Sequence, residues 1–280
     1  MSEMLSLSND PLLFISVMVA KILAVFLVVV LIVAYATYAE RKIIGRMQTR
    51  LGPTMTGPLG LLQPIADGLK LFFKEDIIPA QSSKLAFILA PMMILVPAFI
   101  TIAVIPFGGM ITVGGYQVPL QITDLNVGIL YILAMAGLGV YGIVLAGWAS
   151  NNKYSLLGGV RSAAQMVSYE LAAGLAIISV FMLSETLSLR GIVEAQAGSV
   201  MDWYIFSQPL AFCLFVITSL AEINRTPFDL PEAETELVSG FCTEYSSMKY
   251  ALFFMAEYAN MIVVSAITAT LFLGGRASMN

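Results

Sequence analysis

Six apolar stretches in the 280-residue chain each approach the length that a helix needs to cross a bilayer. Because the hydrocarbon core of a bilayer is about 30 Å thick, such a helix needs about 20 mainly apolar residues. Only 11% of the residues are charged, whereas a soluble domain has about 25%. The sequence therefore predicts an all-α integral membrane protein, a single transmembrane domain over residues 1–280. Its six predicted spans cover roughly residues 12–39, 85–107, 125–149, 161–184, 205–223 and 248–274.

The basic residues are distributed unevenly among the segments between these spans. Segment 40–84 carries seven Lys and Arg residues, and segments 150–161 and 224–249 carry two each. The alternate segments carry only Arg190 and Arg276. Basic loops of membrane proteins are retained in the cytoplasm. We therefore predict that the three basic segments are cytoplasmic and that the N-terminus lies outside, on the periplasmic side.

The sequence is poor in the side chains that usually hold redox cofactors. It has no histidine, and Cys213 and Cys242 are its only cysteines. This composition excludes a disulfide framework, a histidine-ligated haem, an iron–sulfur cluster and an ordinary zinc site. We expect no metal site and no catalytic redox residue in this chain. Any electron transfer must therefore take place in a partner protein.

The first cytoplasmic segment contains an amphipathic pattern. After Pro64, the residues Ile65, Leu69, Phe72 and Phe73 recur at helical spacing, with charged residues on much of the other face. Such a pattern is typical of a helix lying in the membrane interface. It fits a simple anchor on the cytoplasmic side. On the pattern alone the anchor is favoured, and the alternative is a wall beside a lateral opening for an amphipathic lipid ligand.

Three glutamates fall within the apolar spans. Glu170 follows Arg161 by nine residues and Glu257 follows Lys249 by eight, so both lie about 12–13 Å along a helix from the cytoplasmic end. Glu222 ends its span. Each carboxyl group could simply be paired or protonated, but three in one chain favour a proton pathway inside the bundle. Lys21 is a weaker signal, because its long side chain can reach the interface.

The densest group of charges lies between residues 222 and 244. Pro227 and Pro231 interrupt helix formation there and predict an ordered loop. Asp229 and the acid three residues later resemble a capping box at a helix start. Five carboxylates share Arg225 as their only nearby cation, and their mutual repulsion predicts that some have raised pKa values. A solvated acidic loop is the alternative. The five acids are Asp229, Glu232, Glu234, Glu236 and Glu244.

The two longer segments on the opposite side carry weaker patterns. Alternating residues in the Gly-rich segment 108–124 predict a small hairpin. Segment 185–204 predicts a short amphipathic helix, with Leu187, Leu189 and Ile192 on its apolar side.

Several long motifs together resemble the H-type membrane subunits of bacterial proton-pumping NADH–quinone oxidoreductase, respiratory complex I. The resemblance runs over essentially the whole chain. The motifs are Asn224-Arg-Thr-Pro-Phe-Asp-Leu-Pro-Glu-Ala-Glu, Glu244-Tyr-Ser-Ser-Met-Lys, Leu252-Phe-Phe-Met-Ala-Glu-Tyr, Glu40-Arg-Lys, Arg50-Leu-Gly-Pro, Gly60-Leu-Leu-Gln-Pro-Ile-Ala-Asp and Arg161-Ser-Ala-Ala-Gln-Met-Val-Ser-Tyr-Glu.

This resemblance implies a membrane base on which a hydrophilic redox arm docks, enclosing much of a quinone tunnel. The tunnel would open among the first span, the amphipathic helix and the last span. The residues implied along the tunnel and its charged end are Glu40, Arg41, Arg50, Phe254, Arg225, Asp229, Glu232 and Glu234. The acidic path toward the pumping subunits would comprise Glu170, Glu222, Glu236, Glu244 and Glu257.

The resemblance also implies partners and a location. Quinone would be the substrate, with NADH, FMN and iron–sulfur clusters in partner subunits. Small membrane subunits and antiporter-like pump subunits would be neighbours in the bacterial cell inner membrane. Family members usually continue into about two further transmembrane helices, so we expect this chain to be a fragment, a shortened natural form or a product with a misread C-terminus.

Two other functions fit the same apolar spans. One is the homologous membrane anchor of a membrane-bound hydrogenase or formate hydrogenlyase, in which electrons reduce protons rather than quinone. The close agreement of the loop and first-segment motifs speaks against it. The other is a self-standing ion transporter, for which internal repeats or interrupted helices around a midplane site would be expected. The sequence shows no repeat, and Pro91 and Pro97 in one span support this alternative only thinly.

Overall fold

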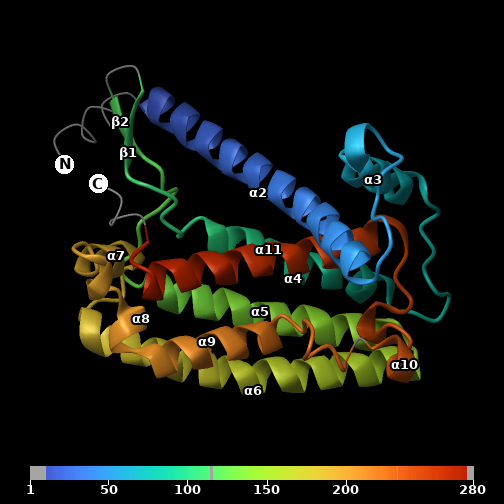
Figure 1. Cartoon of the computed structure of the whole chain (residues 1–280). Coiled ribbons are helices and arrows are strands. Elements are labelled where there is room, and N and C mark those ends of the chain that lie inside the picture. Colours follow the sequence, from blue (N-terminus) through green and yellow to red (C-terminus); the bar gives the residue numbers. More distant parts are fainter. Residues whose placement is uncertain (1–10, 114–115, 232, 276–280) are drawn as a thin grey trace.

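The computed structural model describes residues 11–113, 116–231 and 233–275, and long apolar helices dominate this part of the chain (Figure 1). Five of them are long and apolar enough to cross a membrane, which agrees with an all-α multi-pass membrane protein. These are α2 (Pro11–Met47), α4 (Lys84–Ile102), α5 (Gly128–Ala149), α6 (Lys153–Ser184) and α11 (Ser247–Phe272). The shorter helices are α3 (Gln63–Phe73), α7 (Leu189–Ala195), α8 (Tyr204–Ser207), α9 (Pro209–Glu222) and α10 (Glu234–Leu237), with 3-10 turns at Pro58–Gly60, Val200–Asp202 and Gly240–Cys242.

Several boundaries differ from the predicted ones. Helix α2 continues past residue 39 to Met47, and α6 already begins at Lys153, so both carry basic residues that were expected in loops. The predicted span 205–223 is divided at Gln208, whose φ of −132° and ψ of 53° are not helical. Pro209 then starts α9, whose 14 residues extend only about 21 Å at about 1.5 Å per residue.

The bundle has two distinct ends (Figure 1). Helices α3 and α10 lie at one end, whereas α7 and the hairpin lie at the other. The segments predicted to be cytoplasmic therefore share one end of the molecule, and the segments predicted to face outward share the opposite end. Helix α2 crosses the bundle obliquely between the two ends.

The smaller elements agree with their sequence patterns. An antiparallel hairpin joins β1 (Met110–Val113) to β2 (Tyr116–Pro119), with Met110 opposite Pro119. The amphipathic helix appears as α3 and the outer helix as α7. Leu189 and Ile192 of α7 are buried.

Close approach of backbones holds the central helices together. Gly142 of α5 faces α4 so closely that an added Cβ would lie 2.4 Å from Cγ1 of Ile94 and 3.0 Å from the Ala90 carbonyl oxygen. In lipid the hydrophobic effect does not drive helices together. Small residues let the helix backbones approach closely, and the resulting van der Waals contacts stabilise the association.

Polar contacts hold both ends of α2 against this bundle. Near the outer end, Lys21 donates from Nζ to the carbonyl oxygen of Gln121 at 2.7 Å. The buried Gln121 side chain in turn donates to the Val104 carbonyl at 2.8 Å. Lys21 therefore contacts a segment that is itself fixed to the end of α4. The inner end is held through Glu40, described below.

The Gly142 contact yields a stability prediction. Gly142→Ala should force α4 and α5 apart, at a cost of about 1–3 kcal/mol for overpacking. Gly139→Ala on the same helix is the matched control, because an added Cβ there meets nothing within 4 Å. Thermal unfolding of the purified assembly should show a lower Tm for Gly142→Ala only. Equal Tm values would contradict the packing seen here.

Candidate functional site

Arg225 joins two helices that are far apart in the sequence. It follows the end of α9, and its two terminal nitrogens each donate to one oxygen of the Glu40 carboxylate on α2 at 3.1 Å. Its Nε lies 2.7 Å from Oε1 of Glu257 on α11, as an ion pair without the geometry of a directed hydrogen bond. Burial lowers the pKa of Arg225, but Glu257, Tyr258 and Glu40 together raise it above its ordinary value. Arg225 is therefore a permanent cation shared by two carboxylates.

Tyr258 completes this cluster. Its hydroxyl donates to Oε2 of Glu40, and its ring lies under the Arg225 guanidinium, whose carbon is 4.7 Å from the ring centroid. Sequence reasoning missed Tyr258. The available signal was its position directly after Glu257, at the end of one of the long motifs.

A buried amide network fixes the chain on either side of Arg225. Asn224 has a φ of +54° and donates to the Ser162 hydroxyl at 2.5 Å. Gln165 Nε2 has acceptors at 2.8–2.9 Å in the Ala221 carbonyl, the Asn224 side chain and the Phe228 carbonyl. Both Ser162 and Gln165 belong to α6. This network therefore holds the start of the loop against α6 and sets the direction in which Arg225 points.

Asp229 lies near the same cluster. Its Oδ1 is buried and has no hydrogen-bond partner among the described residues. Burial raises the pKa of the Asp229 carboxyl, and Arg225 opposes this increase only in part. The raised pKa agrees with the prediction that some acids of this loop are perturbed. Its cause here is burial rather than crowding by neighbouring acids.

The other acids of the loop do not all gather at Arg225. Glu236 pairs with Arg161 of α6 at 2.9 Å on the exposed surface, and Glu244 accepts from Asn152 at 2.6 Å. Glu232 and the side chain of Glu234 lie outside the described residues. The predicted capping box is wrong, because α10 begins at Glu234 after Ala233 and has no side-chain cap.

The remaining tunnel residues lie at or near the surface. Arg41 forms an exposed ion pair with Asp67 of α3. Arg50 donates to Gln48 at 2.8 Å. Phe254 is 40% exposed and also lines an internal cavity. The Arg41 contact ties the end of α2 to the amphipathic helix.

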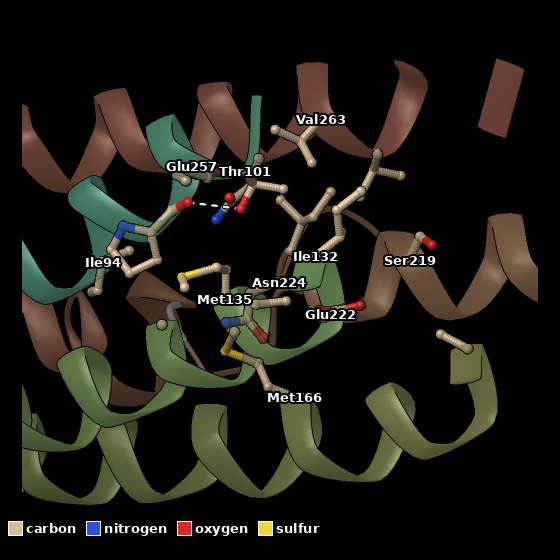
Figure 2. Close-up of a pocket in the computed structure, with 18 of the residues that line it drawn as sticks. Ile94, Thr101, Ile132, Met135, Met166, Ser219, Glu222, Asn224, Glu257 and Val263 are labelled. Atoms are coloured by element: carbon tan, nitrogen blue, oxygen red, sulfur yellow. Dashed lines mark hydrogen bonds between the residues drawn. The ribbon is translucent and has the colours of Figure 1, made fainter. Parts of the chain in front are cut away.

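This cavity lies between α4, α5, α6, α9 and α11 and has a volume of about 120 Å³ (Figure 2). Its walls are mainly apolar, including Ile94, Ile132 and Val263. Glu257 and Glu222 both line it. Because Glu257 also contacts Arg225, the cavity begins at the charged cluster and extends to Glu222.

Glu170 lies beyond Glu222. Its Oε1 is 3.1 Å from the position that a Cβ on Gly137 of α5 would occupy. Glu170 is close enough to Glu222 to interact with it electrostatically. The three span glutamates therefore follow one another from the cluster into the bundle, as Glu257, Glu222 and Glu170. Within the described residues, no group of three or more His, Cys, Asp or Glu side chains could hold a metal ion.

The fold and site define a class of protein: a multi-pass helical membrane protein with a partly buried acid–arginine cluster beside an apolar cavity that two glutamates line. The chain belongs to the NADH dehydrogenase family, whose model matches residues 20–280. Over 276 residues it is 71% identical to an NADH-quinone oxidoreductase H-type subunit of Geobacter sulfurreducens, covering 95% of this chain and 79% of the relative. It is 71% identical over 276 residues to an H-type subunit of the same enzyme in Geobacter metallireducens, with the same coverage of each chain. An H-type subunit of Koribacter versatilis is 53% identical over 275 residues, covering 94% of this chain and 78% of the relative.

These relatives confirm the family that the sequence motifs indicated. The chain is a membrane subunit of an NADH–quinone oxidoreductase complex, and thus part of an enzyme.

The raised pKa of Asp229 predicts a specific pH dependence. The folded protein binds a proton at Asp229 more tightly than the unfolded chain does. This group therefore adds stability below the ordinary aspartate pKa and loses that contribution as the pH rises through the raised native value. The Tm of the wild type relative to that of Asp229→Asn should therefore fall as the pH rises above about 4. Asp124→Asn, at an exposed aspartate, controls for the substitution itself, and a pH-independent difference for Asp229→Asn would contradict the prediction.

Proposed function

We propose that this chain forms much of the quinone-binding tunnel of its complex and also starts the acidic path that couples quinone reduction to proton pumping. Arg225 is the observation that carries this proposal, because it contacts a carboxylate on each side. Glu40 lies on α2, beside the proposed tunnel, and Glu257 lines the cavity. The names of the relatives, which are subunits of NADH–quinone oxidoreductases, support the same function.

The tunnel would open among α2, α3 and α11. The outward side chains of α2 and α3 are largely apolar, as at Ile43, Ile65 and Phe72, and suit an isoprenoid tail. At the inner end, Arg225 would stabilise negative charge that develops on the quinone headgroup during reduction. The residues that we place along the tunnel and its charged end are Glu40, Arg41, Arg50, Phe254, Arg225, Asp229, Glu232 and Glu234.

The acidic path would lead from Glu257 across the cavity to Glu222 and on to Glu170. Glu236 and Glu244 would contribute from the loop. Ionisable residues inside a membrane are costly and usually mark ion or proton pathways. Glu222 and Glu257 are the only acidic or basic side chains among the described residues that line the cavity, so no other carboxylate or basic group lies on its wall to compete for the proton.

The coupling that we propose is electrostatic. Glu40 and Glu257 share one guanidinium, which also acts electrostatically on Asp229, so the balance of charge at the cluster is sensitive to any added charge. Negative charge on a bound quinone would compete for Arg225 and raise the affinity of the neighbouring carboxylates for protons. Because Glu257 belongs to both the cluster and the cavity wall, the change would pass directly into the acidic path.

The same proposal places the chain in its assembly. Segments 40–84, 150–161 and 224–249 would face the cytoplasm, where a hydrophilic arm with FMN and iron–sulfur clusters takes electrons from NADH. Small membrane subunits and antiporter-like pump subunits would be lateral neighbours in the bacterial inner membrane, with the N-terminus outside. No contact in the described structure favours the hydrogenase anchor or a self-standing transporter.

The role of Arg225 can be tested in the purified complex. Arg225→Gln leaves Glu40 and Glu257 without their shared cation, so quinone reduction by NADH should fall at least about tenfold, or about 1.4 kcal/mol. Arg190→Gln is the matched control, because it removes an arginine from an exposed pair with Glu194. Reduction of a water-soluble acceptor directly at the redox arm should be unchanged in both variants.

Two outcomes would reject the proposal. Normal quinone turnover in Arg225→Gln would show that the Arg225 cluster takes no part in quinone reduction. Reduced turnover with an unchanged proton uptake per quinone in membrane vesicles would retain the quinone site but remove the cluster from the coupling path.

The orientation can be tested by cysteine labelling. After Cys213 and Cys242 are replaced by serine, Met201→Cys should react with an impermeant maleimide in spheroplasts, whereas Met55→Cys should not. Both methionines are highly exposed, at 75% and 95%, and they lie in segments assigned to opposite sides. Both cysteines should react after solubilisation in dodecyl sulfate, which controls for reactivity. Labelling of Met55→Cys alone in spheroplasts would reverse the orientation.

A further inference from the structure

The cavity has an unusual balance of charge for its depth in the bundle. Among the described residues that line it, two are acidic, Glu222 and Glu257, and none is basic. Glu257 already has Arg225 as its counter-ion. Glu222 has no hydrogen bond and no ion pair within the described part of the chain. Glu170 acts on Glu222 as a group of like charge.

Glu222 also has access to open space. It is partly buried and lines the cavity, where Figure 2 shows it below Ile132. A buried carboxylate without a partner is costly, and an opposite charge brought within hydrogen-bond distance relieves that cost. The protein supplies no such group here among its described residues, but the cavity leaves room for a ligand that does.

The other walls limit what that ligand can be. They are mainly aliphatic, methionine and phenylalanine side chains, so the body of the ligand must be apolar. Phe254 lines the cavity and is also 40% exposed on α11, so the cavity reaches the surface of this chain there. A ligand dissolved in the bilayer could enter there. Anions are excluded by the two carboxylates.

We propose that this cavity is a binding site for small amphipathic amines, whose ammonium group pairs with Glu222 while the apolar body fills the space between α4, α5 and α11. This binding site lies on the proposed acidic path, because Glu222 and Glu257 line the same cavity. Its existence does not depend on turnover, so binding can be measured whether or not those paths are correctly assigned.

The experiment compares two probes of the same shape. Binding of tritiated 1-aminoadamantane to the purified complex in detergent is measured by rapid gel filtration, and unlabelled 1-adamantanol competes as the neutral analogue. We expect saturable binding of the amine, with the alcohol at least about tenfold weaker, because the alcohol cannot form an ion pair. Glu222→Gln should abolish this difference between the probes. Glu185→Gln, at an exposed position, should preserve it.

A matched pair of glycines tests the location. An added Cβ meets nothing within 4 Å at either Gly139 or Gly174, but only Gly139 lines the cavity. Gly139→Leu should therefore fill the space and reduce amine binding at least about tenfold, whereas Gly174→Leu should leave it unchanged. If Gly139→Leu does not assemble, Gly139→Ala serves instead and should weaken binding measurably.

Three results would overturn the proposal. Equal affinity of the wild type for the amine and the alcohol would show partition into an apolar region without ion pairing. An undiminished preference for the amine in Glu222→Gln would assign the ion pair to another carboxylate. Binding that persists unchanged in Gly139→Leu, or that is lost equally in Gly174→Leu, would place the amine elsewhere.

Discussion

The absence of water from the hydrocarbon core is the constraint on which this structure depends. A charge placed there must find its partner inside the protein, because the lipid provides none. Arg225 meets this requirement for residues that are far apart in the chain, since it pairs with Glu40 and contacts Glu257. The cluster therefore brings α2, the loop after α9 and α11 together at one end of the bundle. The charged residues that the sequence marks as functional also make the contacts that fix the helices.

The same constraint explains how α2 is held. Its outward surface is apolar along most of its length, so the hydrophobic effect does not fix its position in lipid. Lys21 and Glu40 are about 19 residues apart, or roughly 28 Å along the helix, which is close to the thickness of the hydrocarbon core. Each makes a polar contact with the bundle, Lys21 through Gln121 and Glu40 through Arg225. Directed contacts at both ends set the angle of the helix.

Periodicity and composition were enough to predict the membrane class, the amphipathic helix, the hairpin and the division into two ends. They failed where tertiary contacts decide. The span at 205–223 looked continuous by hydropathy, but the backbone turns at Gln208 before Pro209. Five neighbouring acids looked like one cluster, yet Glu236 and Glu244 have separate partners on α6 and before it. Tyr258 could not be recognised from pattern alone, because a tyrosine within an apolar span is usually part of the packing.

Glu257 belongs both to the Arg225 cluster and to the wall of the cavity. On one side the carboxylate contacts Arg225, and on the other it lines the cavity that reaches Glu222. Any change in the charge near Arg225 must therefore alter the proton affinity of a group on the cavity wall. Glu222 has no cationic partner among the described residues, so in the proposed path a proton released at Glu257 would be stabilised there. A proton and a small organic cation can each neutralise the negative charge of the Glu222 carboxylate. An amine bound in the cavity would therefore occupy the position that a transferred proton requires.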